Sequence, residues 1–156
     1  LAAAAFWVNG AAPLLLDLRA NRHDLDHVVA LFRMRGFWGA VSKTNHPVLR
    51  YREPVYKTIR ELALSYFHEY TTDDGRKTLR EYSRPFNVKN WPAESAGNRW
   101  TTSENDLWDL ADALDDSPHF TIIDQAQIRT LRRADPIERG AGKMVEWPKK
   151  GRRMLY

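Results

Sequence analysis

The stretch PLLLDLRANRHDLDHVVALFRMRGFWGAVSK, residues 13–43, contains three apolar segments separated by turn signals. Pro13–Leu18 is a continuous apolar run, which is typical of a buried strand. His27–Arg33 and Phe37–Lys43 are rich in strand-forming residues, and a short loop with Arg35 and Gly36 separates them. Two such runs joined by a Gly-containing loop predict an antiparallel hairpin. We therefore expect this stretch to form the centre of an antiparallel sheet.

Helices are expected on both sides of this stretch. Ala2–Val8 is helical in composition and is followed by Asn9-Gly10, a pair that tolerates the backbone geometry of helix ends. Glu53–Tyr70 is predicted as the clearest helix because its apolar residues recur at helical spacing and Pro54 suits a first turn. Two more helices are predicted at Ser103–Leu114 and Asp124–Leu131, each beginning with a capping residue.

The remaining segments extend the sheet and complete the fold. Lys77–Val88 looks extended, and Pro85 confines its later part to an edge or a loop. Strands are also predicted at Phe120–Ile123 and Met144–Trp147, and Asp135-Pro136 is expected to end the helix before it. The whole pattern predicts an α+β fold in which the sheet of residues 13–43 is extended by 77–83 and packs against the 53–70 helix. We expect residues 1–100 to form the core, and residues 101–156 to form a C-terminal extension packed on the same domain.

Composition excludes several classes of protein. The 156 residues are 43% hydrophobic and 12% aromatic, which is typical of a folded globular chain. No apolar run approaches the roughly 18 residues that a membrane-spanning helix needs, so no membrane contact is expected and the predicted location is cytoplasmic. The absence of Cys excludes a disulfide scaffold, a thiolate zinc site and, within this sequence, a cysteine nucleophile.

Charge is distributed unevenly along the chain. The net charge is +4, yet residues 101–128 carry seven acidic and no basic side chains. Residues 129–156 carry nine basic and three acidic side chains, and Lys149–Arg153 is the most basic run. We interpret the acidic block as an exposed helix face and the basic end as a solvated tail. Nucleic-acid binding by the tail is not expected because no stacking aromatics interleave with its charges.

Metal-ligating and phosphate-binding patterns are weak. His23-Asp24-Leu25-Asp26-His27 brings ligand types together, but so compact a loop cannot surround a cation without ligands from elsewhere. The glycines at 36, 39, 140 and 142 lack the strand-to-helix context of a phosphate loop. We therefore expect no cofactor. His68 and His119 are expected to lie at the surface or in satisfied, half-buried positions.

The order of segments resembles the transglutaminase-like superfamily of the papain-like cysteine enzymes. In residues 1–45, a helix of small residues precedes the PLLLDL strand, HVVALFR begins with a His, and FWGAVSKTN follows a Gly turn. In that family, a Cys starts a buried helix, a His begins a strand, and a Gly-Trp strand ends in an Asp-Pro-Thr-like segment. More weakly, residues 40–82 resemble uncharacterised bacterial transglutaminase-like proteins.

The resemblance implies a cysteine hydrolase or acyltransferase that acts on peptide or amide bonds. His27 matches the catalytic His, Trp38 matches the hairpin Trp and is the candidate substrate-binding residue, and Ser42–Asn45 matches the terminal segment. Ser42 stands where the family has Asp, so Ser42 and Asn45 are the candidates for orienting the imidazole, with Asp17 and Asp26 as distant alternatives. The family's Cys is expected upstream of Leu1, because the chain reads as a fragment cut inside a helix.

One alternative function keeps the same fold. The neutral Ser42 brings no negative charge to stabilise an imidazolium, which favours a non-catalytic module that binds a peptide or a partner protein. An upstream helix that begins with Ser, Ala or Gly in place of Cys is the expected mark of such a module.

Overall fold

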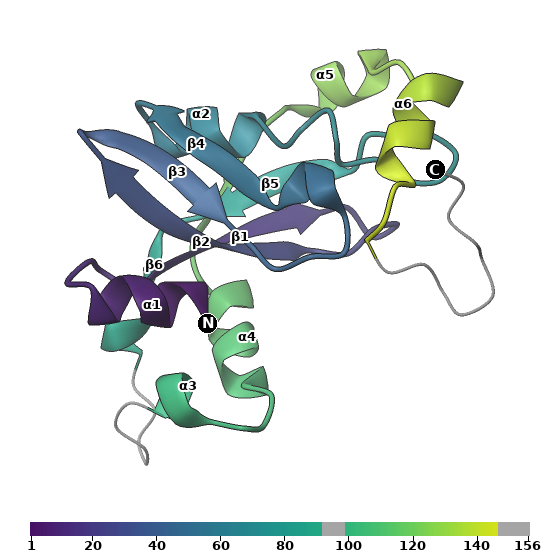
Figure 1. The fold of residues 1–156 in the computed structure, drawn as a ribbon. Coiled ribbons are helices and arrows are strands. Elements are labelled where there is room, and N and C mark those ends of the chain that lie inside the picture. The colour runs from purple at the N-terminus through teal and green to yellow at the C-terminus, as the bar shows by residue number, and fades with distance from the viewer. Residues whose placement is uncertain (92–98, 147–156) are drawn as a thin grey trace.

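The computed structural model describes residues 1–91 and 99–146, and its centre is a seven-stranded antiparallel sheet (Figure 1). The strand order is β4-β3-β2-β1-β5-β7, and β6 pairs with β1. The sheet and its helices confirm the predicted α+β class. The strands are β1 (Leu14–Ala20), β2 (His27–Met34), β3 (Phe37–Val41), β4 (Tyr51–Tyr56), β5 (Leu79–Ser83), β6 (Phe86–Asn87) and β7 (His119–Thr121).

The central hairpin forms as the sequence predicts. β2 pairs with β3 with Met34 opposite Phe37, so Arg35 and Gly36 alone make the turn. Both turn residues have positive φ, 50° for Arg35 and 89° for Gly36. Two consecutive residues in that region are typical of the tight turn whose twist matches that of the paired strands. Glycine at the second position adopts this conformation without steric cost.

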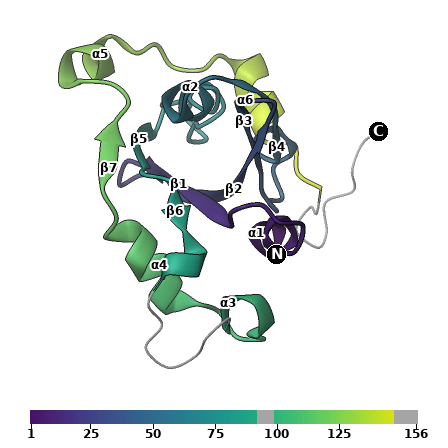
Figure 2. The ribbon, with the colours of Figure 1, turned by 90° about the vertical axis from the view of Figure 1, so that its left-hand side faces the viewer.

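The two faces of the sheet are covered by different helices (Figure 2). The sheet curves around α2 (Ile59–Leu64), and we call the face toward α2 the inner face. Its core comprises Leu16, Leu18, Val29, Leu31 and Ala40 from the strands, and Leu62, Ala63, Tyr66, Phe67 and Tyr70 from α2 and the turns after it. On the other side, the outer face, lie α1 (Ala2–Val8) and α4 (Trp108–Asp115).

Side-chain alternation assigns residues to these faces. Leu31 is buried in the inner core. The next residue, Phe32, packs against Phe6 of α1, with 5.6 Å between the centroids of the two rings. Gly39, opposite Phe32, makes room for this ring, because a Cβ at Gly39 would lie 2.4 Å from the ring's tip. The aromatic contact therefore places α1 against the outer face.

The predicted helix over 53–70 is right only in its middle third, Ile59–Leu64, because a strand precedes it and turns follow it. Residues 51–56 form β4, in which exposed and half-buried side chains alternate, and the helix begins only at Ile59. Pro54 is tolerated because β4 is an edge strand that pairs only with β3 among the described strands. A missing backbone N–H there affects the hydrogen bonds to at most one neighbouring strand. Thr58 and Glu61 form a capping box that starts α2. The apolar spacing that predicted a helix persists from Ile59 onward in α2 and the turns that follow.

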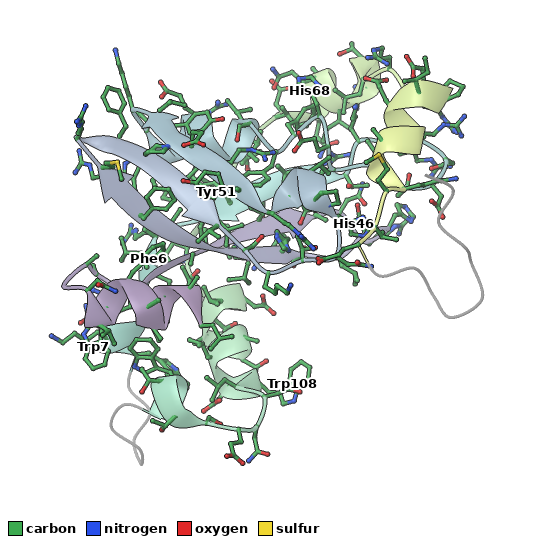
Figure 3. The ribbon with its side chains drawn as sticks, in the orientation of Figure 1. Phe6, Trp7, His46, Tyr51, His68 and Trp108 are labelled. Carbon is green, nitrogen blue, oxygen red and sulfur yellow. The ribbon has the colours of Figure 1, made fainter. Side chains whose placement is uncertain are left out.

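The C-terminal third differs from the prediction in three places. α4 begins at Trp108 instead of Ser103, and Trp108, predicted on its buried stripe, is 71% exposed and points away from the fold (Figure 3). α5 (Gln125–Thr130) is capped by Asp124 as predicted. Asp135-Pro136 does not end α5, which already ends at Thr130. It starts a helix that the prediction missed, α6 (Pro136–Gly142), through a capping box.

Short elements complete the described chain. They are α3 (Arg99–Thr102) and two 3₁₀ turns, η1 (Pro47–Leu49) and η2 (Val88–Asn90). Residues 144–146 are not a strand, contrary to the prediction, while Trp147 and the basic run Lys149–Arg153 lie outside the described residues. Among the helices described, none is long and apolar enough to span a bilayer.

Tyr66 provides a test of the inner core. Its hydroxyl is buried and finds no hydrogen-bond partner among the described residues, while the Arg52 guanidinium lies 4.0 Å from its ring centroid. We expect Tyr66→Phe to raise the free energy of unfolding by about 1 kcal/mol at pH 7, because it removes an unpaired polar group and keeps the ring. Urea denaturation measures this change, and a less stable variant would show that the hydroxyl has a partner.

The same substitution has a pH signature. Burial raises the pKa of Tyr66 to about 12, so the unfolded chain loses this proton at lower pH than the folded one. Between the ordinary tyrosine pKa of about 10 and pH 12, the stability that this group contributes is lost as pH rises. We expect Tyr66→Phe to lose less stability than the wild type between pH 9 and 11.

Candidate functional site

His27 and Ser42 come together at one end of the central hairpin. His27 is the first residue of β2, and Ser42 directly follows β3. Because Leu31 lies opposite Ala40, alternation puts positions 27 and 42 on the inner face. His27 Nε2 lies 2.9 Å from Ser42 Oγ, which is hydrogen-bonding distance. We call His27, Ser42 and the Leu49 carbonyl the His27 site.

The hydrogen bonds fix which imidazole nitrogen carries the proton. Ser42 Oγ donates its only hydrogen to the carbonyl of Leu49 at 2.9 Å. The hydroxyl oxygen is therefore the acceptor in its contact with His27, and Nε2 must donate. The neutral ring assigned from this network carries its hydrogen on Nε2, which leaves the lone pair of Nδ1 as the basic site.

The surroundings of His27 favour the neutral ring. Burial lowers the pKa of His27 most, the nearby His46 lowers it further, and a hydrogen bond with the Leu49 carbonyl opposes them in part. The ring is therefore uncharged at pH 7. A neutral imidazole with a defined tautomer can accept a proton at Nδ1, which is what a general base requires.

Residues from the C-terminal part of the chain border this site. The Asn45 carbonyl accepts a hydrogen bond from the Glu146 backbone at 3.1 Å, and His46 Nδ1 donates to the Gly142 carbonyl at 3.2 Å. Arg50 pairs with the Glu146 carboxylate. Figure 3 shows His46 beside the end of α6. Nothing in the local sequence pattern predicted these contacts, which join segments about a hundred residues apart.

The other predicted site residues take different places. The Asn45 backbone carbonyl contacts Glu146, and Ser42 is the residue whose side chain hydrogen-bonds the imidazole. Trp38 lies opposite Arg33, six residues along β2 from His27, which corresponds to about 20 Å. The Arg33 guanidinium carbon lies 5.3 Å from the centre of the Trp38 ring. The structure therefore does not bring Trp38 to His27.

A second polar arrangement on the outer face was not predicted. Asp17 in β1 and His119 in β7 lie 102 positions apart, yet Nε2 of His119 is 3.0 Å from Oδ2 of Asp17. Their side chains are only 1% and 5% exposed. Ser83 Oγ accepts the backbone N–H of Asp17 at 2.9 Å. Asp17 lies between the inner-facing Leu16 and Leu18 in β1, so its side chain is on the outer face. His27 lies on the inner face, and Asp17 therefore does not orient it.

Asp17 and His119 share a proton. Nδ1 of His119 lies 2.6 Å from the Ser117 carbonyl, which can only accept, so Nδ1 carries a hydrogen. His119 Nε2 and Asp17 Oδ2 are at hydrogen-bonding distance, and a hydrogen bond needs a hydrogen between the two atoms. This is a second hydrogen, in addition to the one on Nδ1. Burial raises the pKa of Asp17, the bond to His119 opposes this effect, and the carboxylates of Asp26 and Asp115 add to it.

Asp26, the other alternative for orienting His27, is also engaged elsewhere. Its Oδ1 accepts the backbone N–H of Ala20 at 2.7 Å. In the same loop, Asp24 accepts a hydrogen bond from the hydroxyl of Thr78. Ser42, which carries no charge, is therefore the side chain that holds His27 in place.

Comparison with models of known protein families gave no match to this sequence, and neither did a search of curated proteins.

Proposed function

We propose that His27 is the general base of a transglutaminase-like acyl-transfer site that acts on peptide or other amide bonds. The observation that carries the proposal is the hydrogen bond from Nε2 to Ser42, because it holds the ring with Nδ1 as the free base. The chain contains no Cys, so the proposal requires a thiol that these 156 residues do not supply. The substrate is a peptide or protein.

The proposed reaction moves one proton back and forth. His27 Nδ1 takes the proton of the cysteine thiol, and the thiolate attacks the amide carbonyl carbon. The tetrahedral intermediate collapses when the imidazolium returns that proton to the leaving amine, and a thioester remains. Water or a second amine then attacks the thioester while His27 accepts its proton, and the thiol is regenerated with a carboxylic acid or a new amide as product.

Ser42 is the residue that sets the strength of this base. A carboxylate in its place would stabilise the imidazolium, whereas the neutral hydroxyl gives a hydrogen bond without that charge. The low pKa of His27 agrees with a weakly basic site, in which the thiol–imidazole pair stays uncharged more often than in a site with Asp.

The experiment on this chain is ¹⁵N NMR of the His27 ring, assigned by comparison with His27→Gln. We expect the Nε2–H tautomer in the wild type, loss of the fixed tautomer in Ser42→Ala, and a raised pKa of His27 in Ser42→Asp. His23→Gln is the matched control because His23 lies in an exposed loop near the site. A hydrogen found on Nδ1 in the wild type would refute the proposed base.

A specific observation favours a second function, a non-catalytic module that binds a peptide or partner protein. α1 packs on the outer face, whereas His27 lies on the inner face. The sheet therefore separates α1 from His27, so a helix on the side of α1 cannot present a thiol to His27 directly. A thiol-bearing chain that binds peptides but gives no acyl-enzyme with 4-nitrophenyl acetate would favour this second function over the first.

A further inference from the structure

Three carboxylates from separate parts of the chain meet on the outer face. Asp17 comes from β1, Asp26 from the loop before β2, and Asp115 from the last turn of α4. One carboxylate oxygen of each lies within 4.8 Å of one oxygen of each of the others. Oxygens that surround one cation at 2.0–2.6 Å lie at comparable distances from one another. We call these three residues the outer-face cluster.

An independent observation points to a ligand at this cluster. Oδ1 of Asp17 is buried and has no hydrogen-bond partner among the described residues. The other oxygen of the same carboxylate is held by His119 at 3.0 Å, so the carboxylate cannot turn to satisfy Oδ1 without breaking that bond. A buried carboxylate oxygen without a partner is strongly unfavourable, and a cation is the group that would satisfy it best.

The Arg19 side chain near the cluster forms its contacts with groups other than the cluster's carboxylates. Arg19 reaches this region. Its Nη2 donates to the backbone carbonyl of Asp115 at 2.6 Å, and its Nη1 lies 3.5 Å from a carboxylate oxygen of Glu81. Arg19 thus contacts the backbone of Asp115 and a carboxylate outside the cluster. The C-terminal end of α4 adds the negative end of its dipole, and Asp116 adds a further acidic residue beside it.

We propose that the outer-face cluster binds a hard divalent cation, of the Mg²⁺, Mn²⁺ or Ca²⁺ class, through the carboxylates of Asp17, Asp26 and Asp115. Carboxylate oxygens are the ligands that these ions prefer, and the exposure of Asp26 and Asp115 lets water complete the coordination shell. His119 acts as a positioning residue, because its bond to Oδ2 holds Asp17 with Oδ1 available. The ion would tie α4 to β1 and to the loop before β2.

The proposal also gives a role to the acidic block of residues 101–128. Asp115 belongs to this block, and the loop His23–His27 supplies Asp26. That loop is too compact to surround a cation by itself. The fold brings it the two further carboxylates that such a site requires.

The test is a titration of this chain with MnCl₂, CaCl₂ and MgCl₂, followed by calorimetry and by the melting temperature. For at least one ion we expect saturable binding and a melting temperature that rises by roughly 5 °C or more at a hundredfold excess over Kd. Asp115→Asn should weaken binding by more than tenfold. Asp112→Asn, an exposed acidic residue one turn earlier on α4, should bind as the wild type does.

Two further measurements keep the proposal testable if a variant folds poorly. Mn²⁺ should broaden the amide NMR signals of residues 17, 26 and 115 in the wild type before those of the loop at 73–74, which is also acidic. Asp17→Asn should lose the ion-dependent shift in melting temperature even if it is more stable without the ion. No binding at millimolar concentrations, or equal binding by wild type and Asp115→Asn, would overturn the proposal.

Discussion

His27→Ala is expected to lower acyl transfer by about two to four orders of magnitude in a chain that carries the upstream thiol. In the proposed reaction the imidazole takes the thiol proton and returns it to the leaving group, so alanine removes both transfers at once. The assay is the release of nitrophenolate from 4-nitrophenyl acetate, with hydroxylamine as the acceptor that separates amine transfer from hydrolysis. We expect the initial burst as well as the steady rate to fall.

The comparison needs variants that leave the imidazole in place. His23→Ala removes an exposed histidine from the preceding loop and should keep the full rate. Ser42→Ala keeps the base but frees its ring, and a smaller loss is expected. The melting temperature of each variant separates a chemical effect from unfolding. A His27→Ala enzyme that retains the burst would rule out the base, and the non-catalytic module would become the better account of the fold.

Gly75→Ala is expected to destabilise the folded chain by about 2–4 kcal/mol, which is a large effect for the addition of one methyl group. Gly75 is buried with φ at 85°, a conformation that L side chains rarely adopt. A Cβ there would lie 2.7 Å from the carbonyl oxygen and 3.2 Å from the nitrogen of Ala134. Since both atoms are backbone, the segment at Ala134 must move.

The displaced segment leads directly to α6 and the His27 site. Ala134 donates its backbone N–H to the Gly75 carbonyl at 2.8 Å, and Asp135 caps α6 in the next position. We expect urea denaturation to show the loss of stability, and limited proteolysis to show faster cleavage between residues 131 and 146. Gly140→Ala is the matched control, because its added Cβ has no heavy atom of the described residues within 4 Å beyond the backbone of its own helix, and alanine favours the helix. Equal stability of the Gly75→Ala protein would contradict this account.

The part of the fold that the sequence predicts well is the part that local contacts determine. The hairpin of β2 and β3 follows from two apolar runs and the Arg35-Gly36 turn, all within 15 residues. Ser42 and His27 meet because the same hairpin sets their register. The 53–70 segment shows the limit: Val55 matches a helical stripe in sequence, but pairing with β3 makes residues 51–56 an edge strand.

Contacts between distant segments could not be predicted in this way. Asp17 looked like part of a buried strand, and His119 looked like an isolated residue after Pro118. Only the pairing of β7 with β5, and of β5 with β1, brings the two side chains together. The contact of Glu146 with Asn45 and Arg50 likewise depends on where α6 packs, which no periodicity near residue 146 indicates.

The proline in β4 also affects how copies of the chain can meet. An edge strand offers its free N–H and C=O groups to any extended segment, and sheets that grow in this way lead to aggregation. Pro54 has no N–H to give, and the register between β4 and β3 shifts between Arg52 and Tyr56, so β4 offers an irregular edge to a strand from another molecule. At the opposite edge, β7 is only three residues long and offers little length for pairing. Both borders of the sheet therefore resist the addition of further strands.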